Sequence, residues 1–297
     1  MIFPVLHSAV GIMTPLLLTA MGGLFTEMSG MLNIALEGLL LTGAFAAVAA
    51  AHYSGSLMAG AAAAILASLI LAAVLAWVTL NLKSNVFITG LAVNLFASGL
   101  TVVLSQRLFL TRGVVAPEHM PRLSRFSVPL IGDIPVIGDI LSGHSYMVYL
   151  SWILLILIWL ALYKTPFGFR LRACAKHSPA LVSLGLKPDA YRFTAFLVSG
   201  VTCGIGGAFL SLNLGVFVPH MSSGKGWTAL VVIFLGGRKP LGLLLAAFLF
   251  GLIEAFSNYA QGILNIPADF ILAFPYIFTL LVMVGVSVYT KRKTQVS

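Results

Sequence analysis

The sequence predicts an all-α fold, a polytopic bundle of helices in a membrane, from its composition and from the way its apolar residues are segmented. Hydrophobic residues make up 60% of the 297-residue chain and charged residues only 8%, and the mean hydropathy is +1.05. A spanning helix needs about 20 mostly apolar residues, because lipid offers no hydrogen-bond partner to an unpaired backbone group. Several stretches meet this requirement, and the composition excludes an ordinary soluble protein.

The chain divides into about nine apolar segments, which we treat as one transmembrane domain over residues 1–297. The segments are 3–24, 31–51, 57–80, 86–105, 146–163, 193–212, 227–235, 241–256 and 270–289. The seventh is short for a crossing and is followed by Gly236, Gly237 and Pro240. It is therefore interpreted either as a span or as a broken, re-entrant helix. No basic stretch precedes the first segment, so we expect that segment to be retained as a helix and not cleaved as a signal peptide.

The orientation is predicted from basic residues, which short loops keep on the cytoplasmic side. The loop 164–192 contains six basic residues against Asp189 alone and is predicted to be cytoplasmic. The basic tail at 291–293 is predicted to be cytoplasmic too. Counting crossings back from the first loop places the N-terminus and the long loop 106–145 outside. That long loop has four arginines against three acidic residues, but long loops translocate largely regardless of charge.

The charge, the small residues and the missing motifs exclude several other functions. The net charge of +9 does not indicate nucleic acid, because the basic residues fall between apolar segments. Cys174 and Cys203 lack metal or redox spacing and are predicted to be packing residues, and Gly200 with Gly204 predicts close helix packing. The sequence contains no phosphate-binding loop, no His-Glu-x-x-His and no Gly-x-Ser-x-Gly motif. We therefore assign no catalytic residue and no metal site, and we expect no ATP hydrolysis by this chain.

Six polar residues among apolar neighbours are the candidates for a translocation pathway. They are Glu27, Asn33, Glu37, Asn94, Glu254 and Asn258. A carboxylate near hydrocarbon is costly, so it is expected to face the bundle interior or a watery path. Asn33 and Glu37 are four residues apart, as are Glu254 and Asn258, so each pair is predicted to share a helical face. Interhelical hydrogen bonds by the same residues are the alternative role.

The cytoplasmic loop contains a predicted short helix. Ser178 is a favourable N-cap, Pro179 suits the first helical position, and Gly185 suits the left-handed position after the last turn. Residues 180–184 lie between them, and Leu181 is predicted to anchor the helix in a partner. A helix resting on lipid headgroups is the alternative.

Three blocks of the sequence together resemble the permease family of bacterial nucleoside, simple-sugar and branched-chain amino-acid ABC importers, most closely its nucleoside-type branch. They are 27–44, 168–185 and 226–242. The first is similar to the pattern Glu-x-Ser-Gly-x-x-Asn-Ile-Gly-x-Glu-Gly, with Ala35 where glycine is usual. In the second, Arg172 and Ala180 match, whereas Ala175 replaces a glycine and His177 an asparagine. The third contains Gly-Trp followed by Leu-Gly-x-x-x-Pro-x-Gly.

The resemblance implies a non-catalytic, multi-pass permease subunit in a bacterial cytoplasmic (inner) membrane. The implied partners are a second permease subunit, identical or homologous, ATPase subunits that bind ATP and magnesium, an extracytoplasmic solute-binding protein and membrane lipid, with no nucleic acid and no cofactor in this chain. The implied cargo is a nucleoside or a related small polar solute, riboflavin or a simple sugar. The residues implied in coupling to the ATPase are Arg172, Ser178, Pro179, Ala180, Leu181 and Gly185.

The alternative function is a secondary transporter or channel driven by an ion gradient, with Glu27, Glu37 and Glu254 as ion sites. The predicted short cytoplasmic helix favours the ABC permease, because a gradient-driven carrier has no need to dock an ATPase.

Overall fold

The computed structural model describes residues 2–117, 120–121, 123–126, 137–261 and the single positions 277, 278, 280, 281, 284 and 285. Within this part of the chain, seven helices are long and apolar enough to cross a membrane. They are α1 (Ile2–Met28), α2 (Leu36–Ser54), α3 (Leu57–Leu80), α4 (Val86–Phe109), α6 (Tyr146–Lys164), α9 (Pro188–Leu212) and α11 (Pro240–Gln261). The all-α membrane fold is thus confirmed. A count of nine spans is not, since the ninth segment, 270–289, lies mostly outside the described residues.

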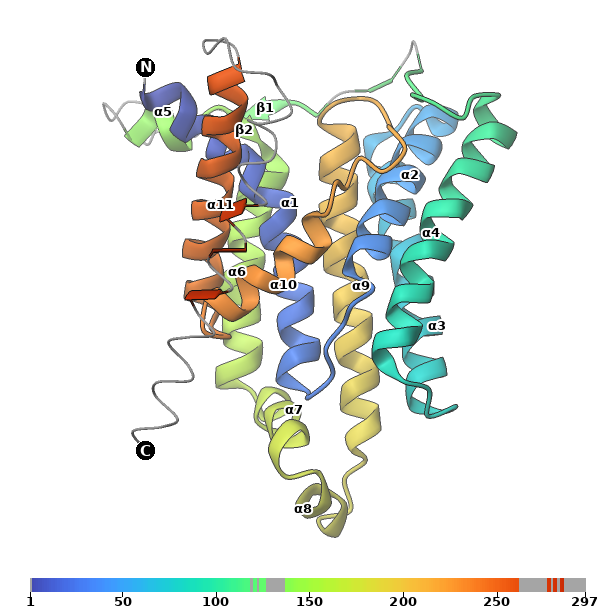
Figure 1. Cartoon of the computed structure of the whole chain (residues 1–297), viewed down its shortest axis with the longest axis vertical. Coiled ribbons are helices and arrows are strands. Elements are labelled where there is room, and N and C mark those ends of the chain that lie inside the picture. Colours follow the sequence, from blue (N-terminus) through green and yellow to red (C-terminus); the bar gives the residue numbers. More distant parts are fainter. Residues whose placement is uncertain are drawn as a thin grey trace.

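Shorter elements lie at the two ends of the bundle and in its interior. The helices α7 (Pro166–Lys176) and α8 (Ser178–Ser183) project from one end (Figure 1). At the opposite end are α5 (Ile137–Leu141) and the antiparallel strands β1 (Arg125–Phe126) and β2 (His144–Ser145), close to the start of α1. The described parts of the loops 106–145 and 164–192 therefore lie at opposite ends, as their assignment to opposite sides of a membrane requires.

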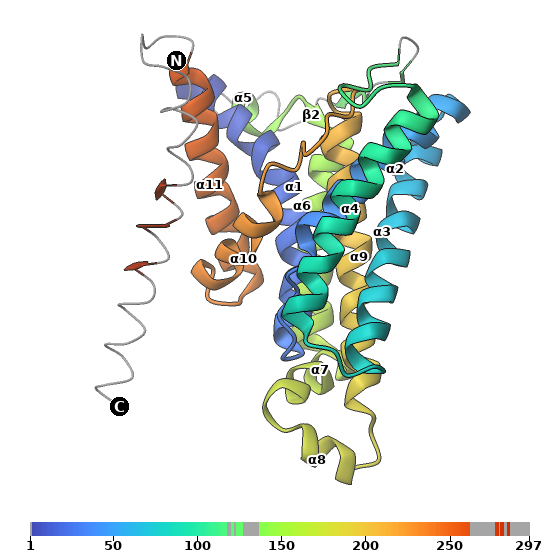
Figure 2. The same ribbon diagram turned by 45° about the vertical axis from the view of Figure 1, so that its right-hand side comes forward.

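The helix α9 lies at the centre of the bundle, where small residues allow close contact. Figure 2 shows α10 (Lys225–Leu235) and α11 on one side, and α2, α3 and α4 on the other, with α1, α6 and α9 between them. A Cβ atom at Gly200 would lie 2.9 Å from Leu69 Cα, and one at Gly204 would lie 2.7 Å from Ile65 Cα. These distances confirm that both glycines are packing residues between α9 and α3.

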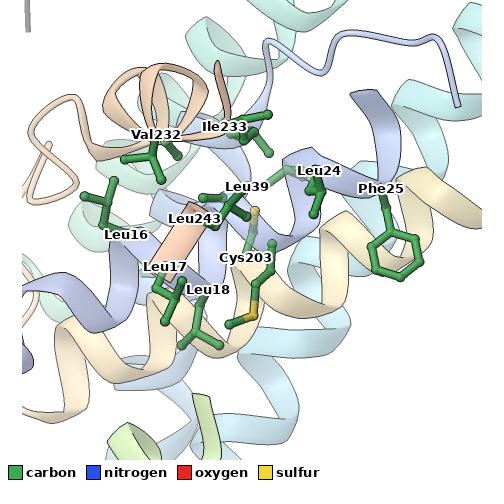
Figure 3. Packing of buried hydrophobic residues seen from close by; sticks show 14 of the residues in the cluster. Leu16, Leu17, Leu18, Leu24, Phe25, Leu39, Cys203, Val232, Ile233 and Leu243 are labelled. Atoms are coloured by element: carbon green, nitrogen blue, oxygen red, sulfur yellow. The ribbon is translucent and has the colours of Figure 1, made fainter. Parts of the chain in front are cut away.

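Buried apolar side chains of α1, α2, α9, α10 and α11 belong to one core cluster, which includes Cys203 of α9. Figure 3 shows part of this cluster, with Cys203 among leucines of α1 and α2 and with Val232 and Ile233 of α10 in the same view. Cys203 and Cys174 are both free thiols and both buried, as predicted for packing residues.

Large apolar side chains remain exposed on the outer faces of α3, α4, α6 and α11. Examples are Leu66, Ile70, Leu95, Phe96, Ile156, Leu157, Leu245 and Leu249. Burial of apolar surface away from water is the main driving force of folding, so such faces are stable only where hydrocarbon or another apolar protein surface covers them. The outside of the bundle is thus suited to lipid.

Two breaks interrupt the helices in the interior. The first follows α1, where Gly30 has a φ of +84° and the amides of Gly30 and Met31 donate to Glu27 O and Thr26 O. This pair of bonds closes the helix in a Schellman motif, after which residues 31–35 run on to α2. We call residues 29–35 the α1–α2 break.

The second break explains the short seventh segment. After α9 the chain turns back into the bundle without helical structure, and α10 then descends to the turn before α11 (Figures 1 and 2). Eleven residues of α10 cover about 16 Å at 1.5 Å per residue, roughly half of a 30 Å hydrocarbon core. Of the two interpretations of this segment, the structure therefore supports a broken helix.

Candidate functional site

The start of α10 is bound by a carboxylate from another helix. Glu37, the second residue of α2, accepts hydrogen bonds from the Gly224 amide at 2.9 Å and the Gly226 amide at 2.7 Å. The first amides of a helix have no partner within it and form the positive end of its dipole. Glu37 therefore supplies both the missing acceptors and a compensating negative charge. We call this contact, together with the ion pair of Lys225, the α10 junction.

Lys225 forms the other half of the α10 junction. Its Nζ atom lies 2.6 Å from Glu254 Oε1 of α11, and the two side chains are 15% and 37% exposed. A cation at a helix N-terminus is unfavourable with respect to the helix dipole, and the carboxylates of Glu254 and Glu37 offset this cost from two sides.

A cavity of about 710 Å³ lies beside the ion pair. Lys225, Glu254 and Asn258 line it, so the pair Glu254 and Asn258 does face the same space, as predicted. Further polar side chains in its lining are His7, Ser8, His144, Ser145, Asn213 and Tyr259. Sites for small ligands have volumes of about 300–1,000 Å³ and a few convergent polar groups, so this cavity has the size and chemistry to admit a small polar solute.

Asn33 does not lie at the α10 junction. It is fully buried, its Nδ2 donates to Ser199 Oγ at 2.9 Å, and its Oδ1 accepts from the Ala35 amide at 2.9 Å. The prediction that Asn33 shares a helical face with Glu37 is wrong, because α2 begins only at Leu36. Asn33 instead holds the α1–α2 break against α9.

Asn94 has a similar structural role from the side of α4. Its Nδ2 donates to Ile34 O at 2.9 Å, and its Oδ1 accepts from the Gly38 amide at 2.7 Å. One amide side chain thus satisfies a carbonyl of the break and an amide in the first turn of α2. Since both polar atoms of Asn94 are used on the backbone, the structural alternative fits this residue better than the pathway role.

Glu27 binds the turn beyond the far end of α10. Its Oε1 lies 2.8 Å from Arg238 Nε, with Glu27 14% exposed and Arg238 57% exposed. Arg238 has a φ of +56° in the turn between α10 and α11. Glutamates therefore bind α10 at its start and, through this turn, beyond its end.

The end of the bundle formed by α7 and α8 differs from the prediction in its capping. Ser178 is not an N-cap: the cap position is His177, without a side-chain bond. The Ser178 hydroxyl donates to Cys174 O, because α7 ends just before α8 and leaves that carbonyl without a helical partner. Gly185 does have a left-handed φ of +73°, and its amide donates to Val182 O.

The exposure of the apolar residues in α8 and just after it also differs from the prediction. Leu181 is only 6% exposed, so it packs within its own chain and is not free to anchor a partner. Val182 and Leu184 are 61% and 75% exposed and form the apolar surface of this end, next to exposed Pro179 and Ala180.

Arg172 is held by aromatic rings of its own chain. Its guanidinium lies 4.7 Å from the centroid of Tyr163 and 4.8 Å from that of Phe169, and its Nε donates to Gly168 O. Cation–π contacts of this kind favour a fixed side-chain position. Arg172 therefore stabilises the junction of α6 and α7.

Sequence reasoning missed two features of the site. The helix α7 has a cap that the sequence displays, since Thr165 Oγ1 accepts from the Gly168 amide and Pro166 occupies the first position. Lys225 is absent from the predicted site residues too, although a charged residue at the edge of an apolar segment is a functional signal.

A bundle of apolar helices with a broken helix, paired interior charges and a polar cavity is typical of membrane transport proteins. Residues 6–287 match the family described as branched-chain amino acid transport system / permease component. The chain belongs to this family. As a permease subunit it is non-catalytic, and ATP hydrolysis is carried out by separate ATPase subunits.

Relatives support the same assignment. The nucleoside ABC transporter permease protein NupC of Lactococcus lactis is 33% identical over 91% of this chain and 88% of its own length. The guanosine ABC transporter permease protein NupQ of Bacillus subtilis is 33% identical over the same shares of both chains. A putative glucose ABC transporter permease protein of Haloferax volcanii is 29% identical over 87% of this chain and 78% of its own length. No solved structure gives a significant match.

Proposed function

We propose that this permease subunit carries a nucleoside or a related small polar solute inward, past the α10 junction, driven by ATPase subunits that bind at α7 and α8. The observation that carries the proposal is the cavity beside Lys225 and Glu254, in which paired charges and amide groups face a space of about 710 Å³. Two relatives named for nucleoside or guanosine transport support a nucleoside cargo. A glucose-named relative supports a sugar as the second candidate, and riboflavin is the third.

The proposed assembly contains a second permease subunit, two ATPase subunits with bound ATP and magnesium, and a solute-binding protein outside the membrane. Two of the relatives, NupQ and NupP, are both guanosine ABC transporter permease proteins of Bacillus subtilis. Their occurrence in one organism supports a pair of different permease chains, and a pair of identical chains is the alternative.

A gradient-driven carrier is less well supported. Glu27 is paired with Arg238, Glu37 with two backbone amides and Glu254 with Lys225. These bonds place all three carboxylates in contacts between segments of the bundle, which favours a structural role over that of ion sites.

Reconstitution tests the proposal directly. The chain would be co-expressed with the ATPase and binding protein encoded beside it and placed in proteoliposomes that contain ATP. Labelled guanosine, uridine, riboflavin and glucose would be offered in turn with the binding protein. We expect nucleoside accumulation that requires ATP hydrolysis, and no ATP turnover by this chain alone. Uptake that follows a proton or sodium gradient without ATP would establish the alternative.

The orientation is tested by cysteine labelling, for which both native thiols are expected to be unreactive. Cys174 and Cys203 are buried. Burial raises the pKa of the Cys174 thiol above its ordinary value, while Arg192 opposes the shift, so less reactive thiolate is present at neutral pH. We expect an impermeant maleimide to label Gly113→Cys, an exposed position at one end, from outside, and Ser183→Cys on α8 only from inside. The reverse pattern would invert the orientation.

Charged substitutions on α8 test the ATPase contact. Val182→Asp and Leu184→Asp are expected to abolish ATPase co-purification and transport but to leave membrane insertion intact, because burying each apolar side chain at an interface contributes about 1.5–3 kcal/mol. Ser183→Asp is the control, since it adds the same charge between them without removing apolar surface. Leu181→Asp is expected to lower the thermal stability of the chain itself, because Leu181 is buried. An active ATPase complex with Val182→Asp and Leu184→Asp would rule out docking through α8.

A further inference from the structure

Arg192, in the second turn of α9, contacts three other segments. Its side chain is 23% exposed and lies 3.0 Å from the carboxylate of Asp189 on the same helix. Its Nε donates to Ser29 O at 3.5 Å, and its Nη2 donates to Cys174 O at 3.3 Å and to Ser178 Oγ at 3.0 Å. One guanidinium therefore joins the end of α1, the last turn of α7 and the first residue of α8.

The position of this arginine has a physical cause. Ser29 follows α1 and Cys174 lies in the last turn of α7, so their carbonyls belong to helix ends that lack backbone partners and form the negative ends of two dipoles. A guanidinium has five donors in a rigid fork and can bind several acceptors at once. The two helix ends also touch, since a Cβ at Gly30 would lie 3.0 Å from Ala175 Cα.

The contacts continue from Arg192 into the bundle along one face of α9. Ser199 is seven residues after Arg192, two helical turns away on the same face, and its hydroxyl accepts from Asn33 in the α1–α2 break. The break thus contacts α9 through Arg192 at its beginning and through Ser199 near its end. Beyond it, Glu37 binds the start of α10.

We propose that Arg192 is a positioning residue that transmits displacement of α8 to the α1–α2 break and from there to the α10 junction. The inference rests on the proposed function of α7 and α8 as the ATPase contact, and it adds the residue through which that movement enters the bundle. The polypeptide itself connects α8 to α7 and α9. The hydrogen bonds of Arg192 additionally connect α8 to the carbonyl at the end of α1. Loss of these bonds leaves ATPase docking in place but weakens its connection to α10, because only the contact of Gly30 with Ala175 and the bond of Asn33 to Ser199 then remain.

The test measures coupling, which a purely structural role would leave unchanged in an assembled complex. Arg192→Met, Arg192→Lys and Ser178→Ala would each be purified with the ATPase, and solute transported per ATP hydrolysed would be compared with that of the unmodified chain. We expect assembly and hydrolysis to persist while this ratio falls about tenfold or more for Arg192→Met. A smaller fall is expected for Arg192→Lys, which keeps the charge without the fork, and for Ser178→Ala, which removes one acceptor.

Asp189→Asn is the matched control, because Asp189 is 65% exposed and belongs to α9 itself, and it is expected to keep the ratio unchanged. An unchanged ratio in Arg192→Met overturns the proposal.

If Arg192→Met does not fold, the ratio of solute transported per ATP hydrolysed in Arg192→Lys and Ser178→Ala decides instead. Failure of both Arg192→Lys and Ser178→Ala to bind the ATPase also overturns it, since Arg192 would then only build the docking surface. A wild-type chain that binds no ATPase refutes the proposed function itself.

Discussion

Replacing Glu37 by alanine is expected to abolish transport and to lower the melting temperature of the purified protein. The change removes the acceptor of two amides at the start of α10, in bonds that are part-buried, and a donor left unpaired away from water costs up to about 1–3 kcal/mol. Since about 1.4 kcal/mol corresponds to a factor of ten, the two lost bonds are sufficient to displace α10 in most molecules. Fluorescence-monitored melting in detergent and uptake in proteoliposomes measure the two effects.

Two further variants separate the charge of Glu37 from its shape. Glu37→Gln keeps one acceptor oxygen but places an amide donor opposite a backbone amide, so we expect an intermediate loss. Glu27→Gln is the comparison, because it removes the charge from the other glutamate that holds α10, in a pair whose arginine is 57% exposed, and we expect a smaller loss than for Glu37→Gln. If Glu37→Leu melts and transports like the unmodified chain, the carboxylate has neither a structural nor a transport role.

The second large effect is expected from Gly226→Ala in the first turn of α10. A Cβ atom there would lie 2.3 Å from the Glu37 amide nitrogen and 2.5 Å from Glu37 Cα. Both are backbone atoms that no rotamer change can move, so α10 must separate from α2 and lose its bonds to Glu37. Overpacking costs about 1–3 kcal/mol, and here the lost hydrogen bonds are added. We expect reduced abundance, a lower melting temperature and no transport.

Gly99→Ala is the matched control for this variant. Gly99 is a helical glycine of α4, and a Cβ atom added to it would have no neighbouring atom within 4 Å. Alanine there is expected to preserve stability and transport, because it fills open space and favours the helix. Equal behaviour of Gly226→Ala and Gly99→Ala would show that the close approach of α10 to α2 has no functional importance.

The seven long helices of the described residues are predictable from the sequence because apolar length alone decides them. The predicted span 57–80 coincides with α3, and Glu27, Asn33 and Glu37 mark the polar break after α1. The prediction that Asn33 and Glu37 share a helical face assumes that the helix continues through this break. It does not, and the prediction is wrong for that reason. Local pattern cannot show where a helix starts when its first turn is held by distant groups.

The contacts of the site could not be predicted for a related reason. The amide partner of Glu37 is 187 residues away in the sequence, and the partner of Asn33 is 166 residues away. In α8 and at the residue after it, the sequence shows the apolar residues Leu181, Val182 and Leu184, but only the structure shows that Leu181 is buried while the other two are exposed. Which residues form hydrogen bonds across the bundle, and whether a side chain faces inward or outward, depend on how the whole bundle packs.

The long separation between these partners has a consequence for the synthesis of the protein. Asn33 and Glu37 leave the ribosome well before Ser199 and Gly226, their partners 166 and 189 residues later. At about 5–20 residues per second, this delay amounts to roughly 10–40 seconds. During that time the first helical hairpin has polar groups without their final partners, so it must wait beside the insertion machinery or exposed to water. The α1–α2 break, although near the N-terminus, is thus among the last parts of the bundle to reach its final structure.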